Sequence, residues 1–127
     1  MTTQEAYEKI REYFNRPGAV LGKDINTGDC YYSENDRKCA VGCLIPDYLY
    51  RRSYEVAGSI EHLRVFLEEE GNARARKVLD IIDGPGKENE KKFGFLVCAQ
   101  NLHDASDDVP TFLGLLNLHA RNCELVV

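Results

Sequence analysis

Apolar side chains recur at intervals of three and four residues along most of this chain, which is the spacing that predicts amphipathic helices. The first predicted helix lies within the first fifteen residues, with Thr2 or Thr3 as its N-cap and Glu5 as the capping-box partner. It ends before Pro17, because proline disfavours helical geometry at the residue that precedes it. Its apolar positions are Ala6, Tyr7, Ile10, Tyr13 and Phe14.

Three or four further helices are predicted after residue 58. Residues typical of an N-cap precede three of them, namely Ser59, Asn72 and either Asp107 or Asp108. Gly71 supplies a C-terminal stop for the first of the four. The predicted helices cover residues 60–70, 73–83 and 87–103, followed by the stretch from Pro110 to His119.

The segment between residues 19 and 33 predicts a small β element. Residues 19–21 and 30–32 are short apolar runs that favour extended structure, and residues 26–29 are typical of a turn. The predicted fold class is therefore α+β and helix-rich: one compact domain over residues 1–127 with about five helices and a small β element near residues 20–33.

Residues 39–45 carry no charge, and so short a run does not separate a buried helix from a buried strand. We favour a short helix that Asp36 caps and Pro46 ends. A strand paired with residues 30–32 is the alternative.

The composition is that of an ordinary folded domain: 127 residues, 43% of them hydrophobic and 29% charged. The net charge of −5 is spread evenly, which argues against a general nucleic-acid binder. No apolar run is long enough to cross a bilayer, so no membrane association is expected. The five cysteines and the lack of an export signal at the N-terminus predict reduced thiols in the cytoplasm.

A cysteine nucleophile is one candidate chemistry. The predicted short helix places Cys39 at a helix N-terminus, where the helix dipole favours a thiolate. His103 would act as the base, and Asp104 would supply the orienting carboxylate. Neighbouring residues on a helix point about 100° apart, which weakens the pairing of His103 with Asp104. The alternative is that the thiols are core residues and that His103 and Asp104 mark a helix C-terminus.

Zinc is a second candidate chemistry, because Cys39 and Cys43 are four residues apart and share one face of a helix. Cys30 and one of the histidines, His62, His103 or His119, would complete the ligands. The chain has no Cys-x-x-Cys pair and no close pair of histidines, so we predict no metal ligand and no cofactor.

A Tyr- and Arg-rich stretch is the candidate binding surface, since both residue types are enriched at interface hot spots. The alternative is that the tyrosine rings pack inward with their hydroxyls at the surface. The residues of this stretch are Tyr48, Tyr50, Arg51, Arg52 and Tyr54.

Three segments carry a resemblance to a known family. Residues 38–50 read Lys-Cys-Ala-Val-Gly-Cys-Leu-Ile-Pro-Asp-x-x-Tyr, a Cys-x-Tyr segment at 30–32 precedes them, and Gln-x-x-His-Asp follows at 100–104. This pattern resembles a family of small uncharacterised proteins from bacteriophages and bacteria, over about residues 5–125. The sequence departs from the family pattern after Tyr32, where an arginine is missing, and at Phe112, which replaces a tryptophan. The resemblance implies a phage-related setting and no particular activity.

These observations predict a small cytoplasmic accessory protein, encoded by a phage or prophage, that binds a host or defence-system protein without catalysis. An inhibitor of the anti-CRISPR type fits this description. The alternatives are a cysteine-dependent enzyme using Cys39 with His103, a protein that sequesters a small molecule, and a zinc-supported binding protein. A homodimer is compatible with the sequence, because two-fold pairs are the commonest oligomers.

Overall fold

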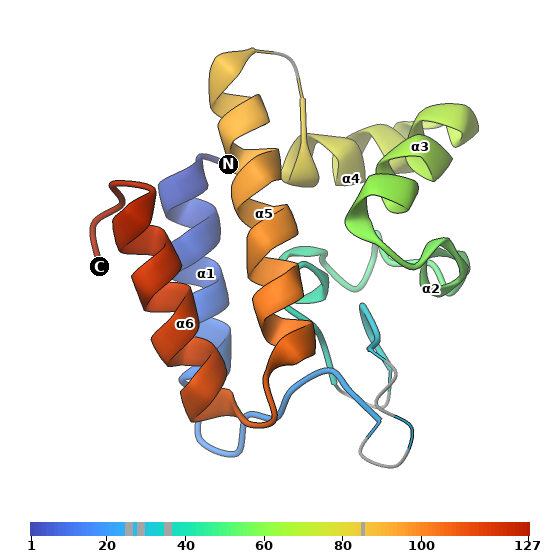
Figure 1. Ribbon diagram of the computed structural model, residues 1–127. Coiled ribbons are helices and arrows are strands. Elements are labelled where there is room, and N and C mark those ends of the chain that lie inside the picture. The colour runs from blue at the N-terminus through green and yellow to red at the C-terminus, as the bar shows by residue number, and fades with distance from the viewer. Residues whose placement is uncertain (25–26, 28–29, 35–36, 85) are drawn as a thin grey trace.

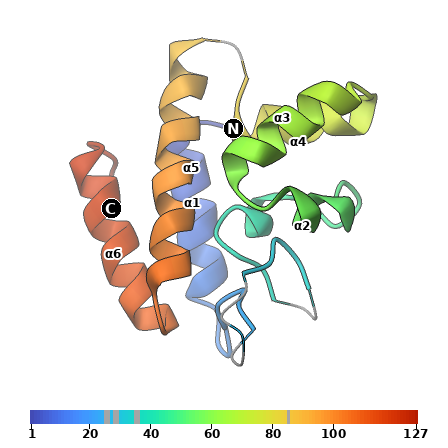
Figure 2. The same cartoon turned by 45° about the vertical axis from the view of Figure 1, so that its right-hand side comes forward.

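The computed structural model describes residues 1–24, 27, 30–34, 37–84 and 86–127, and over these residues the protein is all-α (Figure 1). Helices α1, α5 and α6 contact one another as a bundle, and α3 and α4 form a second pair that packs against α5. Short helix α2 precedes α3 and contacts it (Figure 2). The bounds are α1 Thr3–Phe14, the 3-10 turn η1 Gly42–Leu44, α2 Ser53–Ala57, α3 Ile60–Glu70, α4 Ala73–Ile82, α5 Lys87–Ala105 and α6 Val109–Asn122.

The predicted capping residues set the helix boundaries. Thr2 forms the complete capping box of α1, while the side chains of Ser59, Asn72 and Asp108 accept backbone N–H groups at the starts of α3, α4 and α6. Gly71 ends α3 in the left-handed conformation, with φ of 64°. The five main predicted helices are therefore confirmed. Helix α2 was not predicted, because five residues are too few to show a hydrophobic period.

The predicted α+β class, with a β element near residues 20–33, is wrong. Within the part of the chain that the structure describes there is no strand, and the only β pairing consists of isolated bridges. Backbone groups that would have formed a ladder are used by side chains instead. The N–H of Gly22 donates to His103, and the N–H of Tyr32 donates to Glu55. The bridges join Lys23 to Cys30 and Glu34 to Arg37.

Residues 39–45 form a helical turn that contains η1 and ends before Pro46, so the favoured short helix is confirmed only for residues 42–44 and the alternative strand is wrong. Gly42 packs directly on the backbone of Tyr32, and a Cβ atom there would lie 1.8 Å from the Tyr32 carbonyl oxygen. This close approach requires glycine. The predicted Asp36 cap and most of the predicted turn at 26–29 lie outside the described residues.

The buried side chains form one hydrophobic cluster that includes the end of α5. Phe14 of α1 and Phe112 of α6 meet edge to face, with ring centroids 5.0 Å apart. Both rings also border the imidazole of His103, at 5.8 and 5.5 Å. The bundle therefore holds the His103 ring in a fixed position inside the core.

The contact at Gly42 can be tested with a matched pair of substitutions. We expect Gly42→Ala to lower the free energy of unfolding by about 3 kcal/mol, because the new methyl group overlaps backbone that cannot move aside. Gly114→Ala is the control: this exposed position in α6 has open space, and alanine should stabilise the helix by about 0.5–1 kcal/mol. Urea denaturation measures both, and a Gly42→Ala protein as stable as the unmodified chain would contradict the packing.

Candidate functional site

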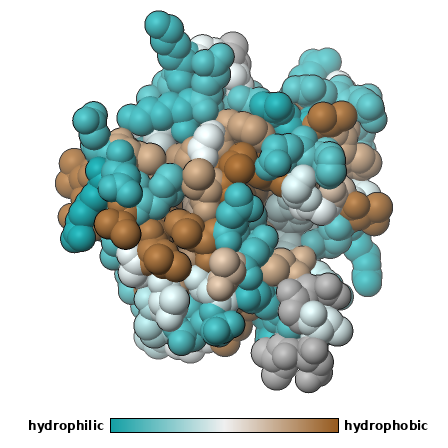
Figure 3. Space-filling view, viewed as in Figure 1, coloured by the Kyte–Doolittle hydropathy of each residue, from teal (hydrophilic) through white to brown (hydrophobic). Residues whose placement is uncertain are grey.

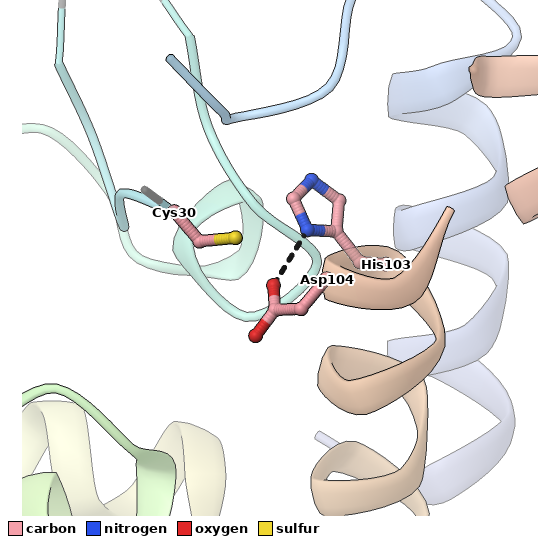
Figure 4. A group of neighbouring side chains, drawn as sticks. All are labelled: Cys30, His103 and Asp104. Atoms are coloured by element: carbon pink, nitrogen blue, oxygen red, sulfur yellow. Dashed lines mark hydrogen bonds and ion pairs between the residues drawn. The ribbon is translucent and has the colours of Figure 1, made fainter. Parts of the chain in front are cut away.

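The imidazole of His103, in the last turn of α5, has both ring nitrogens hydrogen-bonded. Its Nε2 lies 3.0 Å from the Gly22 nitrogen, and its Nδ1 lies 2.9 Å from Oδ1 of Asp104. A backbone N–H can only donate, so Nε2 accepts and must be unprotonated. The hydrogen of the neutral ring is therefore on Nδ1 and is donated to Asp104 (Figure 4). Neither nitrogen remains available to accept a proton from a substrate or a thiol.

Gln100, one turn earlier on α5, extends this network. Its side-chain nitrogen donates to Asp104 at 2.7 Å, and its side-chain oxygen accepts the N–H of Val41 at 3.0 Å. Gln100 and His103 thus fasten two irregular segments, around residues 22 and 41, to one helix. The adjacent residues His103 and Asp104 do interact, although neighbouring positions on a helix point about 100° apart.

Asp104 is ionised at neutral pH. Burial alone would raise the pKa of this carboxyl, but hydrogen bonds from His103, Cys30 and Gln100 outweigh burial and lower the pKa below its ordinary value. A carboxyl whose folded-state pKa is lowered stabilises the fold above its unfolded pKa, and that contribution is lost as the pH falls through the folded value. The network is therefore intact at neutral pH and weakens in acid.

The thiols of Cys39 and Cys43 are poor nucleophiles. Burial raises the pKa of Cys39 well above its ordinary value, and it raises the pKa of Cys43 to about 12. Each sulfur is also held locally: Sγ of Cys39 accepts the N–H of Gly42, and Cys43 donates to the carbonyl of Ala40. The geometry gives no support to the predicted use of Cys39 with His103, because the thiol stays protonated and the imidazole has no free nitrogen.

Cys30 is the thiol that lies beside His103 and Asp104 (Figure 4). One ligand atom from each of these three residues falls within 4.8 Å of the others. A metal ion between them would bind Nδ1 of His103, which faces Asp104, and would force the ring hydrogen onto Nε2. That hydrogen would then face the N–H of Gly22. The cluster fits a network of hydrogen bonds better than it fits a metal centre.

A pocket of about 300 Å³ opens beside this network, and we call it the Asp104 pocket. It lies between the segment after Cys30, the first turn of α3 and the last turns of α5. Segments that are far apart in sequence meet here, around residues 30–32, 39, 58–61 and 100–104. The described lining consists of residues 30–32, 39, 58–61, 100, 101 and 104.

The Tyr- and Arg-rich stretch divides into an outer and an inner part. Tyr48 is 71% exposed, and both Arg51 and Arg52 are exposed. Tyr50 is half-buried, whereas Tyr54 is fully buried, with its ring edge-on to that of Tyr50. The predicted binding surface therefore keeps its outer members, and Tyr54 belongs to the core beneath them.

Glu55 is a structurally important residue that the sequence did not reveal. Its carboxylate accepts the N–H groups of Tyr32 and Ser33, at 2.8 and 3.0 Å, and also the hydroxyl of Tyr50. It thereby fastens α2 to the segment after Cys30. The sequence gives no reason to expect this role for Glu55, because a glutamate in a polar stretch is usually a solvated surface residue.

No family model matches the chain, and neither a curated protein nor a solved structure is similar to it at a significant level. None of the described helices combines the length with the apolar character that crossing a membrane requires.

The state of the thiols predicts an order of alkylation. At pH 7.5, iodoacetamide should modify Cys98 first, because its side chain is exposed, while Cys39 and Cys43 react only after unfolding. Peptide mass spectrometry over a time course measures each site, and protein unfolded in guanidinium provides the reference rates. Alkylation of Cys39 in the folded protein as fast as that of Cys98 would restore Cys39 as a candidate nucleophile.

The hydrogen-bonding pattern also predicts the response to a thiophilic metal. Titration with Co²⁺ should give no thiolate-to-cobalt absorption band, because binding at His103 would break the bond from Gly22. A stoichiometric band that disappears in a Cys30→Ser variant would show that Cys30, His103 and Asp104 form a metal centre after all.

Proposed function

We propose that this protein binds a partner protein through the surface around α2 and the first turn of α3, and that it catalyses no reaction itself. The partner class is a host or defence-system protein, in the cytoplasm of the host cell. The resemblance of residues 38–50 to phage and bacterial proteins supports that setting.

The observation that carries the proposal is a group of three adjoining concavities around α2. The first is the Asp104 pocket. The second, the Arg52 pocket, measures about 260 Å³ and lies between α2 and the segment after Cys30. The third, the Val56 groove, measures about 310 Å³ and lies between α2 and α3. Ser33, Glu34, Tyr50, Arg52 and Glu55 line the Arg52 pocket, and Ser53, Val56, Ala57, His62, Val65, Phe66 and Glu69 line the Val56 groove.

The exposed residues of this surface are of the kind that interfaces bury. Val56 and Val65 are 89% and 47% exposed and lie in one groove, and hydrophobic surface is visible over α2 and α3 in Figure 3. Tyr48 and Arg52 add an exposed aromatic ring and an exposed guanidinium group in the stretch that leads into α2. An apolar centre with a polar rim is the usual anatomy of a protein–protein interface.

The surface is also held rigidly from below. Tyr54 fills the core under α2, with its ring edge-on to that of Phe66 in α3 at 6.2 Å. Glu55 fixes the opposite side of α2 through three hydrogen bonds. A surface that is already ordered loses little conformational entropy on binding, which favours affinity.

The proposal is tested by site-specific photocrosslinking in a bacterial host. A photoreactive amino acid at Val56 and at Arg52 should capture the same protein, whereas Leu118, which is 53% exposed on α6, is the matched control and should not. The captured protein, once purified, should lose at least tenfold in affinity for a Val56→Asp variant and keep its affinity for Leu118→Asp.

Three results would overturn this assignment. They are capture from Leu118 alone, equal affinity for the unmodified chain and Val56→Asp, and capture of no protein from any of the three positions.

A further inference from the structure

The charged side chains that line the Asp104 pocket are both negative. Asp104 contributes a carboxylate whose side chain is 40% exposed, and Glu61 contributes a second, exposed one at the first turn of α3. No lysine or arginine is found among the lining residues that the structure describes. The positive end of α3 opposes this charge, but a helix N-terminus is worth about half a unit charge and cannot cancel two carboxylates.

The carboxylates near the pocket also act on the phenol of Tyr32, one of the lining residues. Burial is the main reason that the pKa of Tyr32 is raised, and the nearby carboxylates of Glu55, Asp104 and Glu61 raise it further. A second anion would therefore be disfavoured in this pocket, and a cation would be favoured.

The size and the lining of the pocket limit the kind of cation that it can bind. About 300 Å³ is at the lower limit of small-molecule sites, so the pocket suits one long side chain. Tyr31 and Tyr32 are among the lining residues, and Asn101 lies at an exposed position one turn before Asp104 on α5. A flat guanidinium group pairs with carboxylate and amide oxygens at its edge and stacks on aromatic rings with its face.

We propose that the Asp104 pocket receives an arginine side chain of the partner protein, with Asp104 as its counter-ion. This inference rests on the proposed function, because it takes the pocket to be part of the surface that binds the partner. The arginine would enter between α3 and α5, while the apolar contacts of the same partner occupy the Val56 groove.

The test is a titration of the protein with N-acetyl-arginine methylamide, followed by ¹H–¹⁵N NMR. The neutral analogue N-acetyl-citrulline methylamide has nearly the same shape and serves as the ligand control. We expect saturable shifts at the amides of residues 58–61 and 101–104, with binding of the citrulline analogue at least tenfold weaker. Equal binding of the two analogues, no saturable shift, or shifts confined to another surface would overturn the inference.

Substitutions identify the counter-ion. Asp104→Asn keeps an oxygen for His103 and Gln100 but removes the charge, and it should weaken binding of the arginine analogue about tenfold. Glu61→Gln, at an exposed position outside the network, should weaken binding less and gives an answer even if Asp104→Asn fails to fold. Glu12→Gln, at an exposed position on α1 outside the proposed surface, is the control and should bind as the unmodified chain does. Unchanged affinity in both pocket variants would overturn the role of the charge.

Three further outcomes bear on this inference, and the last two separate it from the proposed function. Agmatine carries the guanidinium group without a peptide backbone, and much tighter binding of agmatine would assign the pocket to a free guanidino compound and overturn the arginine side chain. A partner captured at Val56, together with equal binding of the two analogues, would overturn only the arginine site. Specific binding of the arginine analogue, together with full affinity of Val56→Asp for the partner, would overturn only the proposed surface.

Discussion

The hydrogen bond from the Gly22 N–H to the buried ring of His103 is the constraint on which the arrangement around the Asp104 pocket depends. It fixes the tautomer of the imidazole, and the tautomer in turn directs the other ring hydrogen at Asp104. Gln100 shares that carboxylate and reaches back to the N–H of Val41. A buried polar group left without a partner costs about 1–3 kcal/mol, so the members of this chain of bonds stabilise one another.

The same hydrogen bonds explain why the geometry gives no support to catalysis by Cys39 with His103. A general base needs a lone pair that faces the substrate, and both nitrogens of His103 face the protein. A cysteine nucleophile needs a stabilised thiolate, and the surroundings of Cys39 oppose one. The polar groups in the interior hold the irregular segments around residues 22 and 41 against α5.

The sequence was sufficient for the long helices and insufficient for the segment between residues 19 and 52. Helix boundaries depend on neighbours in the chain, and Ser59, Asn72 and Asp108 reveal themselves by their spacing from the helices they cap. The β prediction was wrong because the backbone around residues 22 and 32 bonds to His103 and Glu55, which are distant in sequence. The sequence marked Cys39, His103 and Asp104, but their surroundings could not be predicted: only the folded chain shows which thiol lies beside the imidazole.

Two backbone N–H groups donate hydrogen bonds to side chains of α5, and these bonds couple the motions of the loops to those of the helix. Gly22 and Val41 lie in segments without regular structure, where solvent exchange of amide hydrogens is usually rapid. Here each of these amide hydrogens can exchange only when its hydrogen bond to a side chain of α5 breaks. Their deuterium uptake should therefore follow the opening of the last turns of α5, so that loop and helix behave as one cooperative unit.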